Sequence, residues 1–152
     1  MGHTIKLAAL GAVAFMVLDG VSRRIGFVTV GLAAMSLLIG AIGIANVMFI
    51  SVTERTREIG LRLAVGARRK QVLVQFLLEA AVLSSIGGVA GVGAALGIGL
   101  LLTLVLSGFS AVAPPWAIVA GLAASLGVGI AAGYWPALRA ASLDPVEALR
   151  HE

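Results

Sequence analysis

Two long stretches of this 152-residue chain contain no Asp, Glu, Lys or Arg. One covers the 59 residues between Glu79 and Arg139, and the other covers the 29 residues between Arg24 and Glu54. A charge at the centre of a bilayer costs roughly 2.5–3.5 kcal/mol on insertion scales, whereas a soluble domain has no reason to avoid charge over such lengths. The hydrophobic share of 60% and the mean hydropathy of +1.08 agree. The sequence therefore predicts an all-α membrane protein.

The breaks within these stretches predict three transmembrane helices, at residues 25–53, 72–107 and 116–138. The apolar run from Ile25 to Val52 is 28 residues long. At about 1.5 Å per residue it measures roughly 42 Å, more than the roughly 30 Å hydrocarbon core, so it must tilt or project as a stalk. Adjacent Pro114 and Pro115 disfavour helix. They predict an extracytoplasmic turn at 108–115 between the last two helices.

Residues 1–24 form a separate apolar segment whose structure the sequence leaves open. Its apolar run, Leu7 to Leu18, has 12 residues. As a helix it measures about 18 Å, too short to cross a typical bilayer. A short interfacial or partly inserted helix, a shortened first span and a signal sequence all fit, although no A-x-A cleavage site follows the run.

Basic residues predict the orientation of the chain. Six of the eleven lie between Arg55 and Lys70, within the loop at 54–71, and the tail at 139–152 carries two more. By the positive-inside rule, loop and tail are cytoplasmic in a multi-pass inner-membrane protein. The same rule explains the basic cluster without nucleic-acid binding. Asp144 before Pro145 predicts a capped C-terminal cytoplasmic helix.

The loop at 54–71 has the pattern of a short amphipathic helix. Glu58 and Arg62 stand four residues apart in the favourable acid-to-base order, and Gly66 is suited to end the helix. The loop is either a solvated connector whose arginines fix the topology, or a surface that docks on a cytoplasmic partner.

Glycines four residues apart predict close helix packing, because small residues on one face let backbones approach. The three pairs are Gly87 and Gly91, Gly93 and Gly97, and Gly129 and Gly133. The glycine-rich run around them lacks the Gly-Lys-Ser/Thr ending of a phosphate loop and lies within a predicted span. We expect no nucleotide, metal or other cofactor site and no catalytic residues, so the chain is not predicted to be an enzyme.

Two polar residues fall in or near the predicted spans. Glu79 lies nine residues after Lys70, about 13–14 Å along a helix. We favour a structural role for it at the cytoplasmic interface over an intramembrane function. Asn46 is predicted to hydrogen-bond a neighbouring helix.

Two segments resemble the MacB/FtsX-like permease family of ABC transporters. The first is SVTERTREIGLRLAVGARRKQVLVQFLLEA, from Ser51 to Ala80, and the second is YWPALRAASLDPVEALRHE, from Tyr134 to Glu152. With the glycine-rich span between them, the resemblance covers about residues 26–152. The chain is similar to the C-terminal part of a family member, without the ATPase and the extracytoplasmic domain.

The resemblance implies a permease subunit or fragment that works with a cytoplasmic ABC-type ATPase, which would bind ATP and magnesium. ATP hydrolysis would be coupled to export or to extracytoplasmic work, called mechanotransmission, in a homodimer or a heterodimer with another permease. The residues expected to meet the ATPase are Glu54, Arg55, Arg57, Glu58, Arg62, Arg68 and Arg69.

An alternative is a non-transport assembly or regulatory module in the membrane that recruits a cytoplasmic partner. A small passive pore is the weakest hypothesis, because the spans have no acidic residue beyond Glu79 to form a charged ring.

Overall fold

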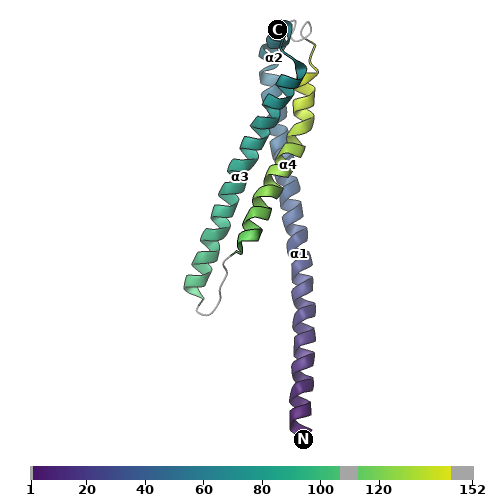
Figure 1. Cartoon of the computed structure of the whole chain (residues 1–152), viewed down its shortest axis with the longest axis vertical. Helices are drawn as coiled ribbons and strands as arrows, with labels where there is room; N and C mark the ends of the chain where they lie inside the picture. The colour runs from purple at the N-terminus through teal and green to yellow at the C-terminus, as the bar shows by residue number, and fades with distance from the viewer. Residues whose placement is uncertain (1, 107–112, 145–152) are drawn as a thin grey trace. The chain divides into compact units, whose positions relative to one another are not determined.

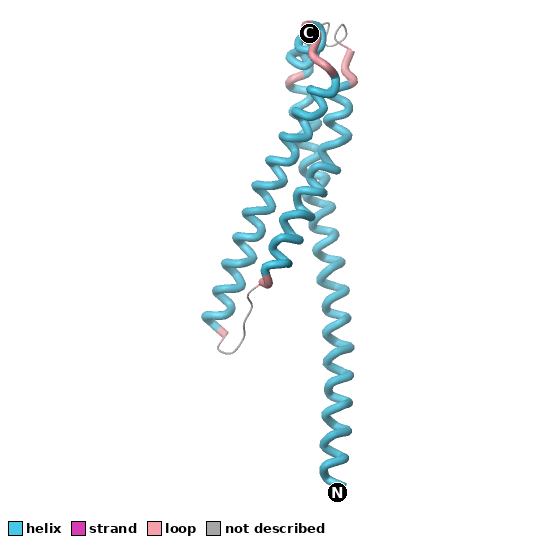
Figure 2. The backbone as a smooth tube through the Cα atoms, in the orientation of Figure 1, coloured by secondary structure: helices cyan, strands magenta, loops and turns pink. Residues whose placement is uncertain are grey.

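The computed structural model describes residues 2–106 and 113–144, with side chains from Leu10 onward. The described chain forms four helices and no strand: α1 (Gly2–Glu54), α2 (Thr56–Ala64), α3 (Arg69–Val105) and α4 (Pro115–Ala141) (Figures 1 and 2). The predicted all-α class is therefore confirmed. The contacts divide the chain into two units, residues 1–38 and residues 39–152. The predicted C-terminal helix after Asp144 and most of the turn at 108–115 lie outside the described residues.

Three of the helices are long and apolar enough to cross a membrane: Leu10–Glu54, Arg69–Val105 and Pro115–Ala141. Each overlaps one of the three predicted spans, at 25–53, 72–107 and 116–138. At about 1.5 Å per residue, the 37 residues of α3 measure roughly 55 Å, so this helix also exceeds the hydrocarbon core. Part of this extra length is the N-terminal turn of α3, where Arg69 and Lys70 precede the first apolar residues.

The first unit is the N-terminal part of α1, the segment for which the sequence leaves an interfacial helix, a shortened first span and a signal sequence open. The structure has one continuous helix from Gly2 through position 24 into the first span. Asp19 and Arg23 form an ion pair of 3.1 Å one turn apart on its surface. Charged residues at this spacing are compatible with uninterrupted helix. The charges that interrupt the apolar run therefore do not interrupt the helix.

In the second unit, α1 passes into α2 through a single non-helical residue, Arg55, with φ −102° and ψ 14°. The backbone hydrogen bonds continue across it, from Arg55 N to Ser51 O at 3.1 Å and from Ile59 N to Arg55 O at 3.0 Å. The Thr56 hydroxyl donates to the Val52 carbonyl at 2.9 Å. Side-chain hydroxyls that bond to the preceding turn commonly bend helices. The joint is thus a hydrogen-bonded interruption of the helix.

Gly66 ends α2, as the sequence predicts. It has a φ of +103°, which side chains with a Cβ rarely adopt. Gly66 N donates to Leu63 O at 3.1 Å, and Ala67 N donates to Arg62 O at 3.0 Å. These two bonds form a Schellman motif, the usual end of a helix at a left-handed glycine. The chain then turns directly into α3.

Helices α3 and α4 run antiparallel, side by side (Figure 1). Small residues form the contact: a Cβ added at Gly129 would overlap Ser84, and one added at Gly133 would overlap Ala80. Nearer the other end, a Cβ at Gly88 would lie 2.9 Å from the Ser125 hydroxyl. The backbones therefore approach as closely as glycine allows.

The apolar core of the second unit lies toward the α2 end of the helices. It combines the last part of α1 with α2, the start of α3 and the end of α4. Its buried members are Met48, Val52, Ile59, Val72, Phe76, Ala80, Ala137, Ala140 and Ala141. This core holds α2 in a fixed position against the spans.

Candidate functional site

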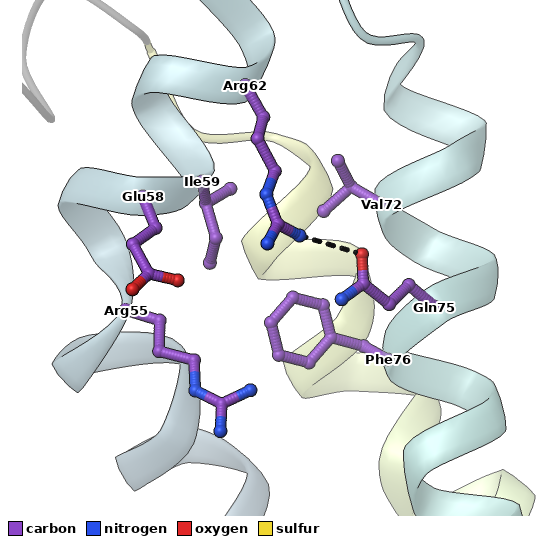
Figure 3. Close-up of a pocket in the computed structure, with 7 residues that line it drawn as sticks. All are labelled: Arg55, Glu58, Ile59, Arg62, Val72, Gln75 and Phe76. Atoms are coloured by element: carbon purple, nitrogen blue, oxygen red, sulfur yellow. Dashed lines mark hydrogen bonds between the residues drawn. The ribbon is translucent and has the colours of Figure 1, made fainter.

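Helix α2 is bound to α3 along one face. Ile59 is 4% exposed and lies against a small pocket of about 20 Å³, which Val72 and Phe76 line from α3 (Figure 3). Phe76 itself is 3% exposed. Burial of apolar side chains contributes roughly 1.5–3 kcal/mol each, so this contact is the main attachment of α2.

A hydrogen bond joins the two helices beside this apolar contact. The Arg62 guanidinium donates to the Gln75 side-chain carbonyl at 3.1 Å (Figure 3). Arg62 forms no ion pair with Glu58, the partner that its spacing suggests; among the described residues it bonds across to α3 instead. An exposed pair one turn apart contributes only about 0.3–0.5 kcal/mol, so a competing acceptor on a neighbouring helix can replace it.

The opposite face of α2 and its flanks remain uncovered. All seven residues that the sequence assigns to ATPase coupling are exposed: Glu54, Arg55, Arg57, Glu58, Arg62, Arg68 and Arg69. The first five lie on α2 or at its N-terminal joint, and the last two at the start of α3. The structure thus brings these side chains to one end of the second unit, around the helix that Ile59 anchors to α3.

The loop end of α3 is also ordered by a short hydrogen-bonded turn. Arg68 N donates to the Gln71 side-chain carbonyl at 2.9 Å, and Gln71 N donates to Arg68 O at 2.8 Å. This is half of a capping box, in which the third residue of a helix satisfies the residue before the helix. The basic residues therefore extend from a defined turn.

The two polar residues near the spans have different surroundings. Glu79 is half-buried on α3 and forms no ion pair with a described residue. Asn46 is exposed on α1, and its side chain makes no hydrogen bond within the described chain. The predicted hydrogen bond from Asn46 to a neighbouring helix stays a prediction.

The predicted glycine pairs divide into two groups. Gly129 and Gly133 lie at the contact between α4 and α3. In contrast, a Cβ at any of the other four would meet nothing within 4 Å; these are Gly87, Gly91, Gly93 and Gly97. Their packing stays a prediction.

Sequence reasoning missed the residues that complete these contacts. Gln75 is one of two glutamines in the first turns of α3, and no spacing rule links it to Arg62. Ser84 and Ser125 are 41 residues apart, and the Ser125 hydroxyl donates to the Ser84 carbonyl at 2.9 Å. That Ser125 faces Gly88 and Ser84 faces Gly129 can be inferred only when the register of α3 against α4 is known.

Known proteins match most of this chain. The family model described as FtsX-like permease C-terminal matches residues 30–145. The macrolide export ATP-binding/permease protein MacB of Bradyrhizobium diazoefficiens is 47% identical over 131 residues, which cover 86% of this chain and 20% of that protein.

Two further relatives have similar coverage. MacB 1/2 of Paracoccus denitrificans is 47% identical over 129 residues, 85% of this chain and 19% of its own. MacB of Bdellovibrio bacteriovorus is 44% identical over 135 residues, 89% of this chain and 21% of its own. The chain thus spans about a fifth of the length of these relatives.

The family match and the three apolar helices together support placement in the inner membrane. The family model that matches this region describes a permease, which is a membrane component. Because the family model matches residues 30–145, most of the chain, this chain belongs to the FtsX-like permease family.

Proposed function

We propose that this chain is the permease part of a MacB/FtsX-type ABC transporter and that α2 receives the movement of a cytoplasmic ABC-type ATPase. The ATPase would bind ATP and magnesium, and the chain would pass its movement to export or to extracytoplasmic work. The relatives are named ATP-binding/permease proteins for macrolide export, which supports the association of this membrane region with an ATPase.

One observation carries the proposal: α2 is anchored to α3 through Ile59 and keeps exposed charged side chains around that contact. Ile59 is buried against α3, whereas Arg57 and Glu58 next to it are exposed. A solvated connector that only sets topology has no need of a buried face. A docking element needs both, because force applied to the exposed face must reach the spans through the buried one.

Two contacts of α2 support a route for that force. The contact of Ile59 with the Val72 and Phe76 pocket leads into α3, and the hydrogen-bonded joint at Arg55 leads into residues 39–54 of α1. A displacement of α2 would therefore act on two spans of the second unit at once.

Charge reversal on the exposed face tests the proposal. We expect Arg57→Glu and Glu58→Arg each to lower recovery of an ABC-type ATPase when the tagged chain is pulled down from crosslinked membranes and co-purified proteins are identified by mass spectrometry. Arg139→Glu is the matched control, because it reverses an exposed charge at the end of α4, away from α2. Unchanged recovery with both α2 variants would contradict the proposal.

Orientation and assembly complete the proposed arrangement. For the ATPase to reach α2, the loop at 54–71 and the C-terminus must face the cytoplasm, as the basic residues predict. The open glycines of α3 would serve contact with a second permease copy or a related permease. A non-transport module that recruits a cytoplasmic partner would use the same α2 surface, and it would show partner binding without ATP-dependent movement of substrate.

A further inference from the structure

A groove of about 210 Å³ lies between the start of α3 and the end of α4, separate from the pocket beneath α2. Its floor is apolar and its rim is basic. Arg69, Lys70 and Leu73 line it from the α3 side, and Leu138, Ala141 and Ser142 line it from the α4 side. An apolar floor under two adjacent cations is unusual for a surface that contacts only water.

The positive charge at this rim is not neutralised within the described chain. Arg69 and Lys70 are both exposed, and neither forms an ion pair with a described residue. The first turn of α3 contains no acidic residue. Both cations also stand at the N-terminal end of a helix, where the dipole favours negative charge. The groove is therefore complementary to an anion.

Aromatic side chains indicate the depth of the groove in the membrane. Tyr134 and Trp135 are 51% and 72% exposed on α4, and they precede Ser142 by about two turns. Exposed Tyr and Trp on membrane helices gather at the headgroup level. Helix α3 begins at Arg69, and its apolar sequence begins at Val72. The aromatic pair therefore lies on the membrane side of the groove, and the two cations lie at the opposite, outer end.

We propose that this groove binds an anionic phospholipid of the bilayer. The phosphate lies between the Arg69 guanidinium and the Lys70 ammonium, and the upper part of an acyl chain covers Leu73, Leu138 and Ala141. Basic pockets between membrane helices at an interface are suited to anionic headgroups. A free phosphate ion would use the cations and leave the apolar floor uncovered, so the lipid accounts for both halves of the groove.

Native mass spectrometry of the purified full chain in detergent tests this inference, with phosphatidylglycerol, cardiolipin and phosphatidylcholine added in turn. No ATPase is present, so the result is independent of the proposed coupling. We expect the two anionic lipids to bind more tightly than phosphatidylcholine. The double variant Arg69→Gln, Lys70→Gln should lose roughly 25-fold in affinity for them, because each basic residue near an anionic lipid contributes about fivefold.

Two control variants separate this site from general charge. Arg55→Gln with Arg57→Gln removes the same charge from residues that do not line the groove, and we expect it to keep the wild-type affinity. Arg69→Lys with Lys70→Arg retains both charges and should also keep it. Far-ultraviolet circular dichroism establishes that every variant retains its helices.

Three outcomes would overturn the inference. Equal loss in both double Gln variants would mean a diffuse basic surface, and equal binding of phosphatidylcholine would mean an apolar groove without charge recognition. Displacement of the phospholipid by millimolar glycerol phosphate would mean a site for a free anion.

Discussion

Gly133 of α4 packs directly on Ala80 of α3, so closely that a Cβ at position 133 would overlap the Ala80 Cβ. Gly129 has the same relationship with Ser84 one turn away. Lipid chains are as apolar as the helix surfaces, so the hydrophobic effect does not hold such helices together, and close packing must do so. The α3 and α4 pair therefore depends on the absence of two side chains.

Gly129→Ala should destabilise the chain by about 1–3 kcal/mol, because the new methyl group must displace Ser84 or separate the helices. Thermal unfolding in detergent, followed by circular dichroism, measures the effect. Gly127→Ala is the matched control on the same helix, where a Cβ meets nothing within 4 Å. There we expect no loss, or a gain of up to about 1 kcal/mol from higher helix propensity. Equal destabilisation of both variants would contradict the packing described.

Ser125→Ala should cost about 0.6 kcal/mol, the average for a hydrogen bond between membrane helices. The change removes the bond from the Ser125 hydroxyl to the Ser84 carbonyl but leaves the contact beside Gly88 in place. Ser85→Ala is the control, since the Ser85 hydroxyl bonds only to Ala81 O within its own helix. The difference between the two variants in unfolding free energy, measured by titration with sodium dodecyl sulfate, gives the value for the interhelical bond.

Gly66→Ala should destabilise the end of α2 by roughly 1–2 kcal/mol, since a φ of +103° is unfavourable for a residue with a Cβ. No neighbouring atom lies within 4 Å of the added Cβ, so the cost is conformational and not steric. We expect faster amide hydrogen exchange in α2 and unchanged exchange in the middle of α3. Gly66→Asn should have a smaller effect, because Asn tolerates left-handed backbone better than Ala. Wild-type exchange rates in the Ala variant would argue against the Schellman ending.

Gln75→Ala should loosen α2 without unfolding the spans. It removes the acceptor of the Arg62 guanidinium, a bond that contributes about 0.5–1.5 kcal/mol at most in its exposed position. Hydrogen exchange of the α2 amides should rise by a few-fold. Gln75→Glu retains an acceptor for Arg62 and should restore slow exchange. If the α2 amides exchange at the same rate in Gln75→Ala and Gln75→Glu, the hydrogen bond from Arg62 does not restrain α2.

Gly93→Leu or Gly97→Leu should reduce crosslinked dimers in detergent if the open glycine surface of α3 contacts another permease copy. Within this protomer, a Cβ at either position meets nothing, so the fold itself should survive. Gly127→Leu on α4, which is equally open, serves as the control for added bulk. Undiminished dimers in both α3 variants would place the intermolecular contact elsewhere.

The sequence predicts the helices of this protein well because lipid imposes strong rules on composition. Charge-free length gives the three spans, Pro114 and Pro115 mark their break, and Gly66 marks the end of α2. The sequence leaves the N-terminal segment open for a physical reason. Asp19 and Arg23 interrupt apolar sequence but not backbone hydrogen bonding, and the two patterns need not end together.

Contacts between helices were harder to predict. The four-residue spacing identified Gly129 and Gly133, yet the same spacing also selected Gly87 and Gly91, which pack on nothing here. Spacing shows that small residues share a face but does not show which helix covers that face. The Arg62 bond to Gln75 shows the same limit, since the local rule named Glu58.

The joint at Arg55 has a mechanical consequence. A flexible coil between α1 and α2 would absorb a displacement of α2, whereas the backbone hydrogen bonds of Arg55, to Ser51 on one side and from Ile59 on the other, hold this joint in a defined conformation. Tilting α2 must therefore bend or rotate residues 39–54, or break those bonds. Any movement of α2 would then be shared with the end of α1 and not lost at the joint.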